Sequence, residues 1–429
     1  MSKDRIDLNA RLKIERLGAR GEGVARTSRG LVFVPYALAG EGVLAEVDGE
    51  RGRLVEILEP SADRVEAICP LFGECGGCVV QNLRHAAYLD WKRDLLVDAL
   101  RAARIETEVR ATVDAHGAGR RRAVFHARAD ARGRVAVGFM RARTHALVEI
   151  DACPLFAPAL AGAPRAAREL AEALASLGKP LDIAVTATSA GLDVDLRGSG
   201  PLDFALTQEL IAIASARDLA RLSNHGVTLI ERRQPHLAVG RAQVMPPAGG
   251  FLQATEAGEA ALADLVLAEI GSARRPADLF AGVGTFALRL AERAEVHAVE
   301  HDAAALAALS KAARSATGLR RATGEARDLF KRPLTRAELA SYDAVVFDPP
   351  RAGAEGQARE LATSDVPLVV GVSCNPQTFA RDAKILVEGG YALEHATPVD
   401  QFRYSAHVEV VGVFRRAARA RTKKGLLSR

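Results

Sequence analysis

The chain has 429 residues, of which 48% are hydrophobic and 26% are charged, and this ordinary globular composition at this length predicts two or three domains. No apolar run reaches the roughly 18 residues that a membrane-spanning helix needs, so we expect no membrane association. The first residues carry scattered charges where a secretory signal would have an apolar core, and we therefore expect a cytoplasmic protein. Five cysteines in a reducing compartment indicate metal ligation or catalysis rather than disulfides.

The net charge of +5 is unevenly distributed along the chain. Lys and Arg gather in residues 84–145, which include the run Arg120-Arg121-Arg122, and again in residues 415–429. Such clustering favours a polyphosphate partner such as RNA. A solvated face with an Arg-rich end would have the same composition, so both interpretations stay open.

Residues 1–60 consist of short segments in which apolar and polar residues alternate. Glycines and charged turns separate these segments, which are LKIERLG, GEGVART, GLVFVPYAL, GVLAEVDG and GRLVEILEP. We expect strands that close into a small β-barrel of the OB type, which presents one sheet face and its loops to oligonucleotides. A structural barrel without a ligand is the alternative.

Residues 61–243 are expected to form a central α+β domain. A cysteine-bearing loop, CPLFGECGGC, precedes the stretch HAAYLDWKRDLLVDALRAAR, whose apolar residues recur with helical spacing. The next segments, RRRAVFHARAD and GRVAVGFMRARTHALVEI, alternate with period two, and we expect a hairpin with its turn at Arg132-Gly133.

Residues 244–429, beyond a turn-rich boundary around Val244, alternate strands with helices. The segments ADLF, VHAVE, YDAVVFD and PLVVGVSC are continuous apolar runs, typical of strands buried on both faces. This alternation predicts an α/β domain with a Rossmann-like, doubly wound parallel sheet. Ligands in that architecture bind at the carboxyl ends of the strands.

A nucleoside site is predicted where the first of these strands ends. Asp278 opens the segment DLFAGVGTF, whose two glycines allow close approach of a ligand to the backbone. Glu300 closes the next strand, where a carboxylate can bind both hydroxyls of a ribose. Phe286-Ala287 replaces the third glycine of a dinucleotide fingerprint, which favours an adenosine ligand without a pyrophosphate, such as S-adenosylmethionine (SAM). A plain helix start is the alternative.

Two later strands end in groups suited to methylation of a carbon atom. Asp348 in YDAVVFDPPR is followed by Arg351, where methyltransferases that act on exocyclic amines carry an aromatic residue, so amine methylation is disfavoured. Cys374 ends the strand PLVVGVSC, and a thiolate added to carbon 6 of uracil would activate the weakly nucleophilic carbon 5. A base must then remove the carbon 5 proton, and Glu409 in SAHVEVV is the candidate. A buried structural cysteine and a strand-edge carboxylate are the alternatives.

The other four cysteines form a separate set, Cys69, Cys75, Cys78 and Cys153. Four thiolates that include a C-x-x-C pair suit tetrahedral zinc or an iron–sulfur cluster, and the spacing alone does not decide between them. Unligated thiols are the third interpretation. If the set binds a metal, Cys153 would tie the predicted hairpin to the cysteine-bearing loop.

Together these motifs resemble the bacterial RNA uracil-C5 methyltransferases of the ribosomal type, which carry a TRAM domain and a [4Fe–4S] cluster. The resemblance covers nearly the whole chain and rests on CPLFGECGGC with DACPL, DLFAGVGTF, DPPRAGA, SCNPQTFARD and HVE. It implies that residues 1–60 are the TRAM barrel, that Cys374 is the nucleophile and that Glu409 is the base. The implied residues of the SAM pocket are Gln253, Phe280, Thr285, Glu300 and Asp348. The implied ligands of the cluster are Cys69, Cys75, Cys78 and Cys153.

We therefore expect a monomeric, SAM-dependent enzyme that forms 5-methyluridine in RNA, with 23S rRNA as the first candidate. The target should be a loop or single strand, because the reacting base must leave its stack. The cluster is expected to be structural, since polar methyl transfer needs no electron, with redox sensing as the alternative. A tRNA uracil-C5 methyltransferase and a non-catalytic iron–sulfur RNA-binding assembly factor are the rival functions. A radical enzyme is disfavoured because Cys153 would close the coordination that such enzymes leave open.

Overall fold

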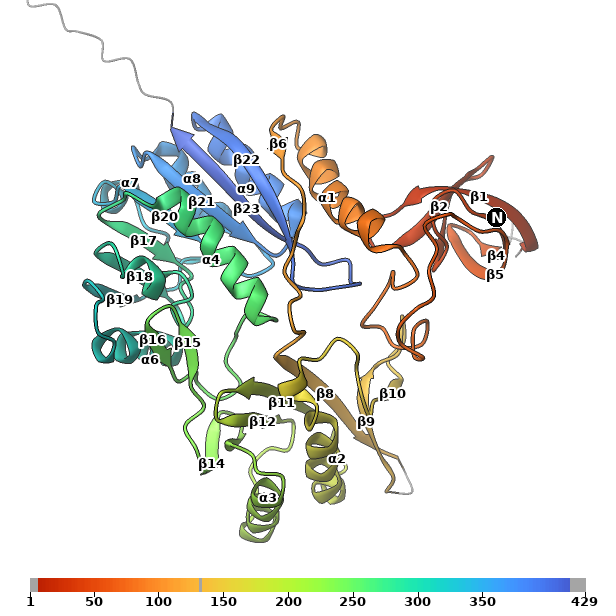
Figure 1. The fold of residues 1–429 in the computed structure, drawn as a ribbon, viewed down its shortest axis with the longest axis horizontal. Coiled ribbons are helices and arrows are strands. Elements are labelled where there is room, and N and C mark those ends of the chain that lie inside the picture. The colour runs from red at the N-terminus through yellow and green to blue at the C-terminus, as the bar shows by residue number, and fades with distance from the viewer. Residues whose placement is uncertain (1–6, 131–132, 417–429) are drawn as a thin grey trace, which may run out of the picture.

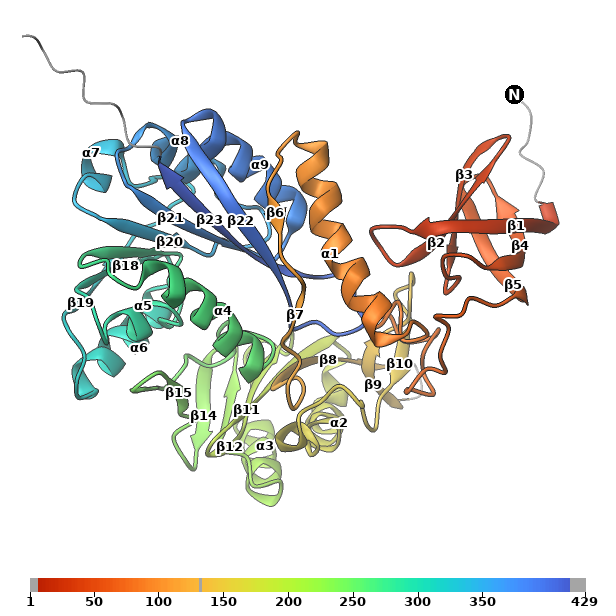
Figure 2. The same ribbon diagram turned by 45° about the horizontal axis from the view of Figure 1, so that its top comes forward.

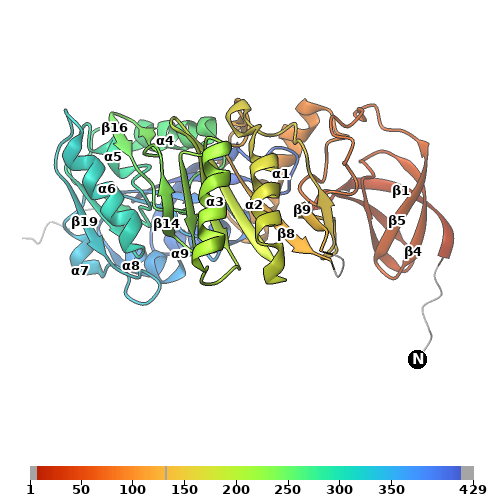
Figure 3. The ribbon, with the colours of Figure 1, turned by 90° about the horizontal axis from the view of Figure 1, so that it is seen from below.

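The structure is a computed structural model that describes residues 7–130 and 133–416. A β-barrel projects at one end of the molecule, and two larger sheets with their helices pack beside each other (Figures 1 and 3). No helix in the described part is long and apolar enough to cross a membrane. Arg132 of the predicted turn and the basic end from residue 417 onward lie outside the described residues.

The five strands expected at the N-terminal end form a closed barrel, which confirms that prediction. They are β1 (Asp7–Leu17), β2 (Glu22–Thr27), β3 (Gly30–Pro35), β4 (Gly42–Asp48) and β5 (Arg51–Glu59). The barrel closes because β1 pairs with both β2 and β4, and β5 pairs with both β4 and β3. Alternation along the strands turns Ile14, Val34 and Val43 inward, where they are buried.

The doubly wound sheet predicted for the C-terminal part is also confirmed. Its strands, in spatial order, are β19 (Ala322–Ala326), β18 (Val296–Glu300), β17 (Pro276–Leu279), β20 (Ala344–Phe347), β21 (Leu368–Ser373), β23 (Glu409–Arg416), β22 (Tyr391–Asp400) and β6 (Glu108–Val109). The strands β17 to β21 are parallel to one another where they pair. In contrast, β23 runs antiparallel to both β21 and β22, between which it lies.

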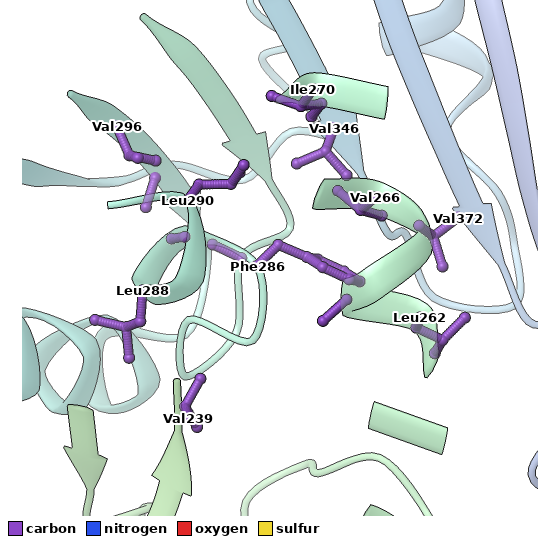
Figure 4. Packing of buried hydrophobic residues seen from close by; sticks show 14 of the residues in the cluster. Val239, Leu262, Val266, Ile270, Phe286, Leu288, Leu290, Val296, Val346 and Val372 are labelled. Atoms are coloured by element: carbon purple, nitrogen blue, oxygen red, sulfur yellow. The ribbon is translucent and has the colours of Figure 1, made fainter. Parts of the chain in front are cut away.

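Helices bury both faces of this sheet. On one face lie α4 (Glu256–Ile270), α5 (Ala287–Leu290) and α6 (Ala303–Ser315), and on the other lie α1 (His85–Ala102), α7 (Arg336–Leu339), α8 (Glu355–Thr363) and α9 (Pro376–Glu388). Leu262, Val266 and Ile270 recur at four-residue spacing on α4 and therefore share the face that packs toward Val346 and Val372 of the sheet (Figure 4).

The central part of the chain forms a seven-stranded sheet. In spatial order its strands are β10 (Leu147–Glu149), β9 (Val135–Met140), β8 (Arg122–Ala129), β11 (Leu181–Thr188), β12 (Gly191–Arg197), β13 (Arg221–Asn224) and β14 (Val227–Glu231). Its helices are α2 (Ala163–Ala173) and α3 (Phe204–Ala216), with short 3-10 helices at Pro158–Leu160 and Ala175–Leu177. The antiparallel pairing of β8 with β9 confirms the predicted hairpin.

Two segments of the expected central domain, residues 61–243, pack on the large C-terminal sheet rather than on the central sheet. Figures 1 and 2 show α1 beside α9 and β6, and both β6 and β7 (Val113–Asp114) pair with β22. The small hairpin of β15 (Leu237–Val239) and β16 (Ala242–Val244) belongs to the same apolar core as α4. Periodicity reveals that a helix has an apolar face, but not which surface that face will meet.

A buried ion pair joins α1 to the end of β22. Lys92 Nζ lies 2.8 Å from Asp400 Oδ1, and both side chains are fully buried. Lys92 also donates hydrogen bonds to the carbonyl oxygens of Phe402 and His407. The Tyr88 hydroxyl donates to the second oxygen of Asp400 at 2.5 Å. Burial lowers the pKa of Lys92, and the charge of Asp400 opposes this lowering.

We expect Lys92→Met to lower the free energy of unfolding by about 3–5 kcal/mol, because Asp400 would stay buried without a cation. Urea denaturation measures this loss. Arg101→Met is the matched control in the same helix, since Arg101 pairs with Asp98 in an exposed position and should contribute about 0–1 kcal/mol. A loss for Lys92→Met no larger than that of the control would contradict the importance of the pair.

Candidate active site

A cavity of about 480 Å³ lies at the carboxyl-terminal edge of the parallel strands. The ends of parallel strands meet at one edge of a sheet, so residues far apart in the chain converge there. All seven residues expected to bind SAM or to act in catalysis line this cavity, namely Gln253, Phe280, Thr285, Glu300, Asp348, Cys374 and Glu409. The structure thus brings all seven residues together, and the role of each stays a prediction.

The turn after β17 forms one end of the cavity. Phe280, Gly282 and Gly284 all have positive φ angles, of 63°, 56° and 97°, so the chain turns sharply. A Cβ on Gly282 would meet no atom within 4 Å, which leaves this backbone open to a ligand. Glu300 accepts the N–H of Gly282 at 2.8 Å through one oxygen and that of Asp302 at 2.7 Å through the other. Each carboxylate oxygen can accept a further hydrogen bond from a ribose hydroxyl.

Asp278 is completely buried beneath the same turn. Its Oδ2 accepts the N–H of Ala287 at 2.8 Å, and its Oδ1 has no hydrogen-bond partner among the described residues. Burial raises the pKa of Asp278 well above its ordinary value, and the charges of Asp348 and Glu300 raise it further. Asp278 therefore ties the glycine turn to the start of α5.

The other end of the cavity contains a thiol and two carboxyl groups. Asp348 follows β20, Cys374 follows β21, and Glu409 is the first residue of β23. Because β23 is antiparallel to β21, with Val410 opposite Ser373, its first residue lies at the edge where β21 ends. The antiparallel strand thus brings the carboxyl group of Glu409 beside the thiol.

Burial raises the pKa of all three groups. The pKa of Asp348 is about 7, and that of Glu409 is about 8 because the charge of Asp348 adds to the effect of burial. The pKa of the Cys374 thiol rises to about 11 through burial and then through the two carboxylates. A carboxyl group with a pKa near neutrality can serve as a general base, because it gains and loses a proton easily.

Two glutamine side chains connect the carboxyl groups. Gln253 Nε2 donates to Asp348 Oδ2 at 3.3 Å. Gln401 Nε2 donates to Gln253 Oε1 at 2.6 Å and to Glu409 Oε1 at 2.9 Å. Gln401 was not predicted from the sequence, because no motif or periodic pattern marks a lone amide between a buried strand and the HVE segment.

Arg351 brings a positive charge to the end of the cavity that contains the thiol. Its Nη2 donates to Nδ1 of His407 at 2.8 Å. Burial, and then the charge of Arg351, lower the pKa of His407 to about 4, so the imidazole is neutral and accepts this bond. Arg351 also opposes the raised pKa of Cys374 and thereby favours the thiolate.

Composition favoured an RNA-facing surface for the basic run Arg120-Arg121-Arg122. Two of these arginines instead donate hydrogen bonds to the protein's own backbone. Arg121 is only 8% exposed and donates to the carbonyl oxygen of Gln253 at 3.0 Å. Arg122 donates to the carbonyl oxygen of Leu252 at 2.6 Å. These two arginines therefore orient the GFLQAT segment at the cavity. Composition alone does not distinguish this role from phosphate binding.

The remaining four cysteines line a second cavity, of about 230 Å³. Burial raises the pKa of Cys75, Cys78 and Cys153, that of Cys78 to about 11. In the part of the chain that the structure describes, no group of three or more His, Cys, Asp or Glu residues could hold a metal ion. A single zinc ion needs four sulfurs at about 2.3 Å from one point, so the zinc interpretation stays a prediction. A larger cluster stays a prediction.

The raised pKa of Glu409 predicts a pH-dependent stability. Between its ordinary pKa and about 8 the folded state binds more protons than the unfolded state, so stability falls as pH rises through this range. We expect Glu409→Gln to gain stability relative to the original chain as the pH increases from about 5 to about 9. Urea denaturation at both pH values measures this, with the exposed Glu209→Gln of α3 as the control. An equal pH dependence for both variants would contradict the raised pKa.

Comparison with known proteins places these features in a family. Residues 277–417 match the family described as tRNA (Uracil-5-)-methyltransferase. The chain is 45% identical over 414 residues to an uncharacterised RNA methyltransferase of Mesorhizobium japonicum, which covers 96% of this chain and 100% of that protein. It is 34% identical to the 23S rRNA (uracil(1939)-C(5))-methyltransferase of Halomonas elongata, over 96% of this chain and 91% of that protein.

The fold has a counterpart among solved structures. The tRNA (uracil-54, C5)-methyltransferase of Pyrococcus abyssi, in complex with S-adenosyl-L-homocysteine, superposes with a TM-score of 0.71 and covers 94% of this chain and 100% of that one. At 22% identity this likeness shows the fold alone. The sequence matches confirm the resemblance drawn from the motifs, and the chain belongs to the RNA methyltransferases of the tRNA (uracil-5-)-methyltransferase family.

Proposed function

We propose that the chain catalyses SAM-dependent methylation of carbon 5 of uridine in 23S rRNA. The observation that carries this proposal is the convergence of Cys374, Asp348 and Glu409 with the nucleoside turn in one cavity. The reaction requires a nucleophile, a base whose pKa lies near neutrality and a site for an adenosine cofactor. The residues of this cavity fit all three requirements.

The residues of the glycine turn fit SAM. The open backbone at Gly282 and the carboxylate of Glu300 would hold the ribose. The rings of Phe280 and Phe330, whose centroids are 5.5 Å apart, offer an apolar surface to the adenine, and Thr285 lines the same end. When bound, SAM supplies an electrophilic methyl group.

The proposed reaction uses the thiol and the carboxyl group in sequence. Cys374 attacks carbon 6 of the uracil as a thiolate, favoured by Arg351, and the displaced electron pair forms an enolate. Carbon 5 would then take up the methyl group, while the bond from that methyl carbon to the sulfonium sulfur breaks and its electron pair stays on sulfur. Glu409 removes the carbon 5 proton, and the released electron pair restores the double bond between carbons 5 and 6 while the thiolate of Cys374 leaves.

Support for rRNA comes from the motif resemblance and from the Halomonas elongata relative. The N-terminal barrel, as a TRAM domain, would bind RNA outside the target loop. A tRNA substrate is the second candidate, because the matching family description and the Pyrococcus abyssi enzyme both name tRNA. A non-catalytic assembly factor is disfavoured, since it would not need a thiol, a base and a nucleoside turn in one cavity.

We also propose that Cys69, Cys75, Cys78 and Cys153 bind a structural [4Fe–4S] cluster. All four line one cavity, and the backbone N–H of Gly77 hydrogen-bonds to the sulfur of Cys75, as is common for cluster thiolates. Such a cluster would hold the segment after the hairpin against the cysteine-bearing loop.

We expect Cys374→Ala to abolish methyl transfer from SAM to RNA, because no other group in the cavity can add to carbon 6.

Glu409→Gln should instead methylate once and stall, which leaves a protein–RNA adduct that survives denaturation. Purification of this adduct from cells and sequencing of its RNA identifies the substrate. Methylation by Cys374→Ala at the original rate would refute covalent catalysis, and a tRNA in the adduct would overturn the assignment to 23S rRNA.

We expect Cys78→Ser to lose iron and acid-labile sulfide, because three thiolates cannot complete the proposed ligand set. Cys374→Ser is the matched control and should retain both, since its thiol lies in the other cavity. Iron and sulfide analysis of anaerobically purified protein measures the difference. Equal iron content in the two variants, or none in the original chain, would contradict the cluster.

A further inference from the structure

Gln401, the residue after β22, is completely buried beside Glu409. Its Oε1 accepts the backbone N–H groups of Ala254 at 2.8 Å and Thr255 at 3.4 Å. Backbone N–H groups can only donate, so the oxygen of the amide must face them. The two N–H bonds of Nε2 are therefore directed to Glu409 and Gln253, and every hydrogen-bonding group of the amide is used.

The start of α4 leaves space for this amide. A Cβ on Gly258 would lie 2.6 Å from Cβ of Gln401 and 2.7 Å from its Oε1, both too close for ordinary contact. Gly258 is helical, and glycine in a helix is less stable than alanine. The close approach of Gln401 gives a physical reason for the glycine at this position.

We propose that Gln401 is a positioning residue for the proton transfer, whose amide orients the carboxyl group of Glu409 and links it through Gln253 to Asp348. This inference rests on the proposed role of Glu409 as the base. Because Gln401 occupies Oε1, the carboxyl group presents Oε2 for the carbon 5 proton. The bond to Glu409 acts on proton removal, so loss of the amide should slow this step more than the thiol addition or the methyl transfer.

The charges around Glu409 are consistent with this role. The ionisable groups that face it are Asp348, Cys374 and Lys92. Burial and Asp348 raise the pKa of Glu409, whereas the hydrogen bond from Gln401 and the charge of Lys92 lower it. A donor amide stabilises the ionised carboxylate, which is the form that accepts a proton.

Gln401→Met tests the proposal, because methionine has a similar length and no N–H donor. Single-turnover reactions with an rRNA transcript should measure two steps separately, the transfer of a labelled methyl group from SAM and the release of tritium from carbon 5 of uridine. We expect tritium release to be slower by about tenfold to a hundredfold, methyl transfer to be slowed much less than this, and the methylated adduct to accumulate. The pH at which tritium release reaches half its maximum should also rise.

A purely structural role would lower both steps together without an adduct, and this result would overturn the inference, as would unchanged release of tritium. Gly258→Ala is a second variant, which displaces Gln401 without removing it and should show the same imbalance between the steps. Gly356→Ala in α8 is its matched control, because a Cβ there meets nothing within 4 Å, and it should behave like the original chain. Thermal unfolding of each variant verifies that it is folded.

Glu409→Gln in the same assay separates the role of Glu409 from that of Gln401. If Glu409→Gln releases tritium at the original rate, the proposed base is wrong and the inference fails with it. If Glu409→Gln stalls as an adduct while Gln401→Met and Gly258→Ala do not, the base stands and only the role of Gln401 is overturned.

Discussion

The buried pair of Lys92 and Asp400 fixes the last segment of the chain that enters the active site. An ammonium group has three donors, and Lys92 directs them to Asp400 and to two carbonyl oxygens of the following loop. Burial of two charges is favourable only when their hydrogen bonds are complete, and Tyr88 completes those of Asp400. The residue after Asp400 is Gln401, and the same loop leads to Glu409. A helix from the first quarter of the chain thus orients the start of the last sheet strand, where Glu409 lies.

The candidate active site combines this fixed loop with two buried acids. Asp348 and Glu409 lie in one cavity with the thiol of Cys374, and all three have raised pKa values. The protein tolerates them because protonated acids avoid much of the cost of a buried charge. The same property suits catalysis, since a carboxyl group with a pKa near neutrality can take a proton and return it to solvent. Burial therefore explains both why these acids are tolerated and why their pKa values suit proton transfer.

Local patterns predicted the secondary structure well, because alternation and apolar runs record which side chains are buried. The barrel, the hairpin of β8 and β9 and the doubly wound sheet all follow from such patterns. The pattern in α1 predicted a helix but not its packing against α9 and β22, since an amphipathic face does not specify its partner. For the same reason residues 85–115 were expected in the central domain, whereas they pack on the large sheet. Composition also could not distinguish Arg121, which serves inside the protein, from an arginine that binds phosphate.

The sequence by itself determined which chemical groups are present and which strand ends carry them. Glycines after a strand, a carboxyl group after the next and a cysteine after a third are local features, so their convergence at one sheet edge followed from the topology of parallel strands. Only the tertiary structure decided that β23 runs antiparallel beside β21, which brings Glu409 to Cys374. It alone also placed Gln401 between Gln253 and Glu409. Hydrogen bonds and pKa values at the site depend on burial and distances between segments far apart in the chain, and a linear pattern carries no record of either.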